Sequence, residues 1–221
     1  PLRLVGSEMC IRDRNKAVLY VNVGDYKNVW DELIRDIPQM RELATEHFDN
    51  WKDTKAFATK ALSASQINNS DVVTDNNRDD NSKNITADNS SEDTSDNITG
   101  IHGFYHKNIF EAVYCTNLLM RSADVLVTKP SELAFYPVPK LFIKRVGGHE
   151  QWGAVHSAEI GDGTLECRDI PHTLQMIKLF MEDDTYIIDM CKNIKKNKQM
   201  GIYNGAYEAV KLAVNMKKSD I

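Results

Sequence analysis

Apolar runs that stop abruptly at polar or glycine turns constrain the fold of this chain more than any other feature. Val125–Val127 is a short β-branched run of the kind that is buried on both faces of a parallel sheet, and polar residues from Thr128 to Glu132 follow it directly. Lys140–Val146 repeats the pattern and ends at Gly147–Gly148. Because ligands of open α/β sheets sit beyond the carboxyl ends of the strands, these two turns predict a ligand cleft.

The amino-terminal part of the chain begins with the same pattern. Ala17–Val23 predicts a buried strand, Gly24–Asp25 predicts a turn, and an amphipathic helix is expected to follow. Residues 48–62 are predicted to be helical, residues 100–106 to form a strand, and residues 109–120 to form a helix. This alternation predicts an α/β fold, a Rossmann-like doubly wound parallel sheet of about five strands.

Apolar residues at helical spacing predict four further helices, and one more strand is expected between them. The helices span 151–159, 171–181, 184–198 and 203–216, and the strand spans 164–167. The apolar positions of these helices are predicted to be core, among them Ile188 and Leu212.

Residues 63–99 differ in composition from the rest of the chain. They are mainly Asn, Asp and Ser, with scarcely an aromatic residue. Such a segment cannot bury enough apolar surface to offset the entropy of ordering it. The sequence therefore predicts a disordered insertion that divides one Rossmann-like domain into residues 15–62 and residues 100–218, which is tolerable because the cost of loop closure grows slowly with length.

Residues 1–14 are set apart for a different reason. Val5–Arg14 contains Met-Cys-Ile-Arg-Asp, which resembles the translation of a transposon adapter used in sequencing libraries. We therefore interpret residues 1–14 as an adapter-derived artefact and exclude them from reasoning about the fold. The native protein is expected to begin upstream.

Charge and composition argue against several classes of protein. The net charge of −5 gives no basic field to attract nucleic acid, and no apolar run approaches the roughly 20 residues of a membrane helix. The cysteines, Cys10, Cys115, Cys167 and Cys191, lack the paired spacing of a disulfide scaffold or a zinc site. The sequence thus predicts a cytoplasmic protein with no nucleic-acid partner, no transmembrane segment, no metal and no cofactor.

Three motifs together resemble a known enzyme family. Residues 123–130 read Ala-Asp-Val-Leu-Val-Thr-Lys-Pro, residues 149–154 read His-Glu-Gln-Trp-Gly-Ala, and residues 159–164 read Glu-Ile-Gly-Asp-Gly-Thr. This set is similar to the nucleotide-sugar-binding half of GT-B glycosyltransferases. Within that family it most resembles the monogalactosyldiacylglycerol synthases and the N-acetylglucosaminyltransferase that makes lipid II.

The resemblance implies that the chain is the carboxyl-terminal half of a two-domain enzyme. The missing amino-terminal domain would supply the acceptor site and the catalytic base, so no catalytic residue is assigned. An acceptor hydroxyl on a lipid or glycan would attack the anomeric carbon of a nucleotide sugar, a uridine diphosphate sugar by this resemblance, and take up a hexose or N-acetylhexosamine. Such an enzyme would be cytoplasmic, and its missing domain could attach it to the face of the inner membrane.

The candidate donor-binding residues follow the predicted strands. Lys129 is expected to stabilise the negative charge of the diphosphate, Glu132 to bind a pair of ribose or sugar hydroxyls, and Glu150 with Gln151 to bind sugar hydroxyls. The full set of candidates is Gly24, Asp25, His106, Thr128, Lys129, Ser131, Glu132, Gly148, His149, Glu150 and Gln151.

Departures from the family pattern keep two other functions open. Pro130–Pro139 holds three prolines where the family has a helix, and a full helix cannot fit there. Residues 152–154 read Trp-Gly-Ala in place of Gly-Asn-Ala. Both departures are consistent with a non-catalytic nucleotide-sugar-binding module. The other alternative is an enzyme that resembles nucleotide-sugar 2-epimerases, because His149–Glu150 would supply an acid and a base in the same cleft.

Overall fold

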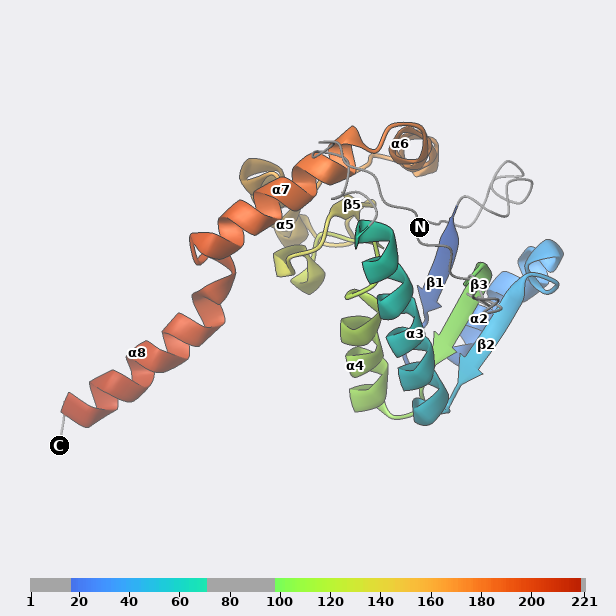
Figure 1. Ribbon diagram of the computed structural model, residues 1–221, viewed down its shortest axis with the longest axis horizontal. Helices are drawn as coiled ribbons and strands as arrows, with labels where there is room; N and C mark the ends of the chain where they lie inside the picture. Colours follow the sequence, from blue (N-terminus) through green and yellow to red (C-terminus); the bar gives the residue numbers. More distant parts are fainter. Residues whose placement is uncertain (1–16, 71–97, 220–221) are drawn as a thin grey trace, which may run out of the picture. The chain divides into compact units, whose positions relative to one another are not determined.

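The chain divides into two compact units, described here from a computed structural model of residues 17–70 and 98–219. Among the described residues, the N-terminal unit comprises 20–70 and 98–122, and the C-terminal unit comprises 123–219 together with 17–19. The described residues form a mixed α/β structure with short parallel sheets and seven α-helices (Figure 1). The predicted α/β class is therefore confirmed at this level. The segment interpreted as adapter-derived lies outside the described residues.

The N-terminal unit is built on a three-stranded sheet. Its elements are β1 (Val18–Asn22), α2 (Lys27–Asp36), the 3-10 turn η1 (Pro38–Met40), β2 (Ala44–Phe48), α3 (Trp51–Ser70), β3 (Gly100–Tyr105) and α4 (Ile109–Leu119). The boundary between the units falls within β1, after Leu19. The strand order is β1-β3-β2, and β2 runs parallel to β3. Beyond the end of β1, Val23 N donates to Phe104 O at 3.0 Å and His106 N donates to Gly24 O at 3.1 Å. The two segments thus advance in the same direction.

Helices cover both faces of this sheet. Gly103 and Phe104 are neighbours in β3, so they point to opposite faces. A Cβ at Gly103 would come within 2.4 Å of the Trp30 ring of α2, so the indole lies directly against the strand backbone. Phe104 packs instead against Phe57 of α3 and Cys115 of α4, two helices that lie side by side in Figure 1. Consequently α2 covers one face, and α3 and α4 cover the other.

Two sequence predictions for this unit are wrong. Phe48 ends strand β2 rather than beginning a helical region. The sequence gives little sign of this strand because Thr45 and Glu46 are exposed at the edge of the sheet. Residues 63–70 of the predicted disordered insertion belong to α3, since extending a formed helix costs far less than nucleating one. Residues 71–97 of that insertion lie outside the described residues.

The C-terminal unit contains a separate two-stranded parallel sheet. Its elements are β4 (Leu126–Thr128), η2 (Glu132–Phe135), β5 (Lys140–Phe142), η3 (Gly148–Glu150), α5 (Gln151–Ile160), α6 (Ile170–Glu182), α7 (Thr185–Gln199), η4 (Ile202–Asn204) and α8 (Gly205–Ser219). Leu126 pairs with Lys140, and Thr128 pairs with Phe142. The short η2 turn agrees with the prediction that no full helix fits among the prolines. The strands of the described residues form one sheet of three strands and one of two, and not the single sheet of about five strands that the sequence predicts.

A buried ion pair holds the C-terminal unit together. The ammonium of Lys140 lies 2.8 Å from a carboxylate oxygen of Asp162, and both side chains are fully buried. Lys140 also donates to the carbonyls of Tyr136 and Val138, and the Tyr203 hydroxyl donates to Asp162 at 2.8 Å. Burial lowers the pKa of Lys140, and the hydrogen bond to Asp162 opposes this shift.

Other predictions for the C-terminal unit need correction. Residues 164–167 do not form a strand, because the only pairing in that region of the described chain is an isolated bridge between Lys140 and Gly163. Ile188 and Leu212 were predicted to be core, but they are 44% and 62% exposed. Helical spacing of apolar residues identifies a helix face and cannot ensure that another element covers it.

No helix among the described residues combines the length and the apolar character that crossing a bilayer requires.

Candidate functional site

The structure places the predicted site residues in both units. Gly24, Asp25 and His106 lie in the N-terminal unit, where they follow β1 and β3. Thr128–Glu132 lies in the C-terminal unit at the end of β4, and Gly148–Gln151 lies beyond β5 in the same unit. All of them come at or after the carboxyl end of a parallel strand. They form one group in each unit.

The turn after β1 is joined to the turn after β3. His106 N donates to Gly24 O at 3.1 Å, and Gly24 N donates to the side chain of Asn22 at 3.0 Å. The Asn22 amide in turn donates to the Thr116 hydroxyl of α4 at 2.8 Å. Gly24 has a φ of +64°, and a Cβ at this position would meet no other atom of the described residues. Glycine is therefore favoured here because it adopts the left-handed backbone conformation without strain, and not because a side chain would clash. Gly24, His106 and the exposed Asp25 therefore lie at one edge of the sheet.

The helices that follow β1 and β3 diverge at this end of the strands. Strands β1 and β3 are neighbours, but the helices that follow them, α2 and α4, cover opposite faces of the sheet. In open α/β sheets the two loops at such a point diverge, and ligands bind between them.

His106 is held on several sides at this edge. Its ring is fully buried, Nε2 lies 3.0 Å from the Thr54 hydroxyl, and the Trp51 ring meets it at nearly a right angle with the centroids 5.6 Å apart. Nδ1 is also buried, and it has no hydrogen-bond partner among the described residues. Burial lowers the pKa of His106, opposed by the carboxylates of Glu111 and Asp49. The imidazole is thus fixed in position while one nitrogen stays available.

Two carboxylates stand near that nitrogen. An oxygen of Glu111, in the first turn of α4, lies 3.8 Å from His106 Nδ1. Asp49, just after β2, has a φ of +50° and accepts a hydrogen bond from Lys107 N at 3.0 Å. One ligand atom from each of Asp49, His106 and Glu111 lies within 4.8 Å of the others. This trio could hold a metal ion.

A second histidine cluster lies inside the same unit. His47 Nδ1 is 2.6 Å from Asp53, and His47 Nε2 is 3.1 Å from His102 Nδ1. The remaining nitrogen of His102 lies 3.1 Å from the carbonyl of Thr99. The His47 ring also stacks on Phe104 with an interplanar angle of 10°. Every ring nitrogen of this cluster has a protein partner, so the cluster serves packing.

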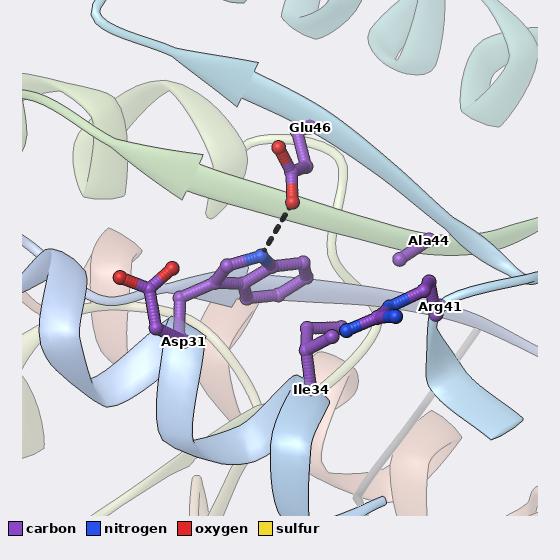
Figure 2. Close-up of a pocket in the computed structure, with 6 residues that line it drawn as sticks. Asp31, Ile34, Arg41, Ala44 and Glu46 are labelled. Carbon is purple, nitrogen blue, oxygen red and sulfur yellow. Dashed lines mark hydrogen bonds between the residues drawn. The ribbon is translucent and has the colours of Figure 1, made fainter. Parts of the chain in front are cut away.

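A hollow of about 540 Å³ lies near the start of β2, away from the carboxyl ends of the strands. The Trp30 indole donates a hydrogen bond of 2.8 Å to Glu46, which is the dashed line in Figure 2. The hollow is lined by Trp30, Asp31, Ile34, Arg41, Ala44 and Glu46. None of the predicted site residues contributes to it.

In the C-terminal unit, Lys129 and Glu150 are paired with each other. The ammonium of Lys129 lies 2.5 Å from one oxygen of Glu150, whose other oxygen accepts from the backbone N–H groups of Val146 and Gly147. The Lys129 hydrogen bond and these two backbone donors lower the pKa of Glu150 to about 2. The same pair raises the pKa of Lys129. Glu150 is buried and closes the glycine turn, whereas Lys129 remains 44% exposed.

The neighbouring candidates in this unit are mostly exposed. Glu132, His149 and Gln151 face solvent, and hydrogen bonds from its own backbone N–H and from Ser131 lower the pKa of Glu132. Gly153, in the Trp-Gly-Ala segment that departs from the family pattern, has a packing function, because a Cβ there would come within 2.5 Å of the Pro130 carbonyl.

The comparison with protein families gives one match, to a domain of unknown function called DUF6938, over residues 3–78 and 65–214. The chain belongs to this family. The DUF6938 match begins within the segment that we set aside as adapter-derived, and its two ranges overlap inside the predicted insertion. No curated protein matches the chain, and no solved structure matches it.

Sequence reasoning gave His106 a role in donor binding, which stays a prediction, and it did not indicate the residues around the imidazole. Asp49, Thr54 and Glu111 reach the imidazole only because β2 pairs with β3 and because α3 and α4 begin at the same edge of the sheet. In the sequence, Asp49 is only an Asp directly after a strand, and Glu111 is only a Glu in the first turn of a helix. Both are common positions for these residue types, so neither residue could be recognised as part of a site.

Proposed function

We propose that this DUF6938 protein binds a nucleotide sugar at the carboxyl ends of its parallel strands. One observation carries the proposal: β1 and β3 are adjacent, their helices diverge to opposite faces, and His106 N bonds to Gly24 O between them. Loops that diverge in this way offer a ligand the backbone groups of two turns and the N-terminus of a helix, which favours a phosphate. Under this proposal the N-terminal unit belongs to a Rossmann-like, doubly wound sheet.

The resemblance to GT-B glycosyltransferases extends the proposal to a reaction. The chain would be the donor half of an enzyme that transfers a hexose or N-acetylhexosamine to a lipid or glycan hydroxyl, with a further domain supplying the acceptor site. The same resemblance gives a second candidate position for the donor, within the C-terminal unit alone. There Lys129 would stabilise the leaving diphosphate, and Thr128, Ser131 and Glu132 would contact the donor. Lys129 is exposed enough to exchange its partner, because Glu150 would keep two backbone donors after the ammonium had left.

A non-catalytic binding module is the second candidate, and the Lys129–Glu150 pair favours it. A cation that is already neutralised by a buried carboxylate stabilises a leaving group less than a free one. In that case the nucleotide sugar would be bound and remain intact.

Hydrogen exchange of the backbone amides tests where the ligand binds. The protein would be compared with and without uridine diphosphate glucose and uridine diphosphate N-acetylglucosamine, after chelator treatment. We expect slower exchange at residues 24–27 and 106–110 when a nucleotide sugar is present. Protection confined to residues 30–46, around the hollow of Figure 2, would contradict the proposed site, as would no protection at saturating ligand.

Lys129→Ala with Lys144→Ala as its matched control tests the proposed contact to the diphosphate. Lys144 is also exposed and lies just beyond β5. Calorimetry should show affinity for the nucleotide sugar falling about tenfold or more in Lys129→Ala, because a lost charge-assisted hydrogen bond to phosphate has roughly that effect. Equal affinities in the two variants would remove Lys129 from the site, and a product assay on the same samples separates the enzyme from the binding module.

A further inference from the structure

Among its described residues, the N-terminal unit contains a buried histidine nitrogen without a partner, on a ring that lies beside two carboxylates. His106 Nδ1 has no hydrogen-bond partner among the described residues, and the nearer Glu111 oxygen is 3.8 Å away. That distance is too long for a direct hydrogen bond. A buried polar atom without a partner is costly in free energy, so its position calls for a ligand.

We propose that Asp49, His106 and Glu111 bind one divalent transition-metal ion. The three ligand atoms lie within 4.8 Å of one another. Around an ion with bonds of about 2.1 Å, ligand atoms stand about 3.4 Å apart at a tetrahedral angle and about 4.2 Å apart on opposite sides. Small rotations of the two carboxylates are therefore enough to bring all three atoms into the coordination sphere.

The imidazole is already oriented for this purpose. If Nε2 donates its proton to the Thr54 hydroxyl, 3.0 Å away, Nδ1 keeps its lone pair, and a carboxylate oxygen of Glu111 lies 3.8 Å from it. Histidines that bind metals commonly have their second nitrogen held in this way, which fixes both the tautomer and the ring. The Trp51 ring and the bond from His106 N to Gly24 O restrict the ring further.

The two carboxylates come from rigid positions. Asp49 keeps its left-handed backbone through hydrogen bonds from its own N–H to Tyr105 O at 2.8 Å and from Lys107 N to its side chain. Glu111 lies in the first turn of α4, which Asn108 caps. Asp49 is exposed and Glu111 is half-buried, so solvent can reach the site and an ion can enter.

The ligand set indicates the class of ion. One imidazole nitrogen with two carboxylate oxygens suits Mn²⁺ and Zn²⁺, whereas Mg²⁺ and Ca²⁺ prefer oxygen ligands alone. Three protein ligands leave positions in the coordination sphere for water or another small ligand. The sequence predicted no metal because it offered only cysteine spacing as a signal, and no cysteine belongs to this trio.

The metal proposal does not depend on nucleotide-sugar binding, and its test uses the metal alone. Chelator-treated protein is titrated with Mn²⁺, and the loss of the electron paramagnetic resonance signal of free Mn²⁺ gives the affinity and stoichiometry. Mn²⁺ is chosen because it avoids thiols such as the exposed Cys191. Competition by Zn²⁺ then tests the second ion. One saturable site per chain is expected.

Asp49→Asn, Glu111→Gln and His106→Gln should each weaken Mn²⁺ binding at least tenfold, since changes even to the partners of metal ligands have effects of that size. Asn at position 49 can keep the backbone conformation and the bond from Lys107, so Asp49→Asn isolates the charge. Because His106 is buried, circular dichroism establishes that each variant is folded, and the two carboxylate variants keep the test valid if His106→Gln unfolds.

Asp53→Asn is the matched control, because Asp53 also accompanies a buried histidine, but one whose nitrogens are both partnered. Mn²⁺ affinity should be unchanged in this variant. The proposal is overturned if the wild-type protein shows no saturable site for Mn²⁺ or Zn²⁺, or if the site survives all three ligand substitutions.

Discussion

His47 and His106 are both buried in the same unit, but their surroundings differ. Both ring nitrogens of His47 have partners inside the protein, and its ring stacks on Phe104. His106 has one nitrogen bound to Thr54 and one without a partner, at the edge where the parallel strands end. Burial alone thus does not separate a structural histidine from a functional one. The useful distinction is whether the protein itself satisfies every polar atom.

The largest expected effect on stability is that of substituting Lys140. Like His47, Lys140 is a buried polar group whose hydrogen-bond partners are protein groups. Lys140→Met should lower the free energy of unfolding by about 3–5 kcal/mol, because it leaves the Asp162 carboxylate buried without its counter-ion. Urea denaturation measures this. The double variant Lys140→Met/Asp162→Leu should recover much of the loss, and a single-variant loss below about 1 kcal/mol would show that the pair is not a structural element.

Substituting either histidine by leucine should affect stability less than the Lys140 substitution does. Only the His106 substitution should affect Mn²⁺ binding. His47→Leu should cost about 1–3 kcal/mol, since it leaves a nitrogen of His102 and a carboxylate oxygen of Asp53 unpaired. Mn²⁺ binding should persist in this variant. His106→Leu should abolish Mn²⁺ binding even where denaturation shows that the protein is folded. If His47→Leu remained folded and lost the metal, the distinction between the histidines would be wrong.

The smallest effect is expected from the Lys129–Glu150 pair, and it appears as a pH dependence. The folded-state pKa of Glu150 is about 2, below its ordinary value of 4.5, so the unfolded state binds the proton more readily. The stabilisation should be fully present above pH 4.5 and should decline as the pH falls toward 2. Glu150→Gln should flatten this part of the stability profile, whereas Glu159→Gln, exposed on α5, should not. Parallel profiles for Glu150→Gln and the wild type would contradict the assignment.

Features encoded in contiguous residues could be predicted from the sequence. β1, the Gly24 turn and α2 follow one another in the chain, and each has its own local signal, an apolar run, a glycine or an amphipathic repeat. His106 was identified for the same reason, since it directly follows an apolar strand. The absence of a full helix between β4 and β5 was likewise predicted from the three prolines of Pro130–Pro139.

Features that depend on pairing between distant segments could not be predicted. β2 has only His47 buried, and it becomes a strand through parallel pairing with β3 across the long segment that separates them. The contact of Asp49 with Lys107 and the nearness of Glu111 both depend on that pairing. The buried partner of Lys140 is equally non-local. The metal-binding trio is therefore visible only in three dimensions.

Nitrogen-15 NMR of the imidazole rings tests the central distinction most directly. Zn²⁺ is added to chelator-treated protein, and the two ring nitrogens of His47, His102 and His106 are followed separately. The Nδ1 resonance of His106 should move strongly and saturate at one equivalent of metal, while both nitrogens of His47 stay in place. A response at His47 or His102 with His106 unchanged would contradict the account, because it would place the available nitrogen in the cluster that the structure shows to be fully partnered.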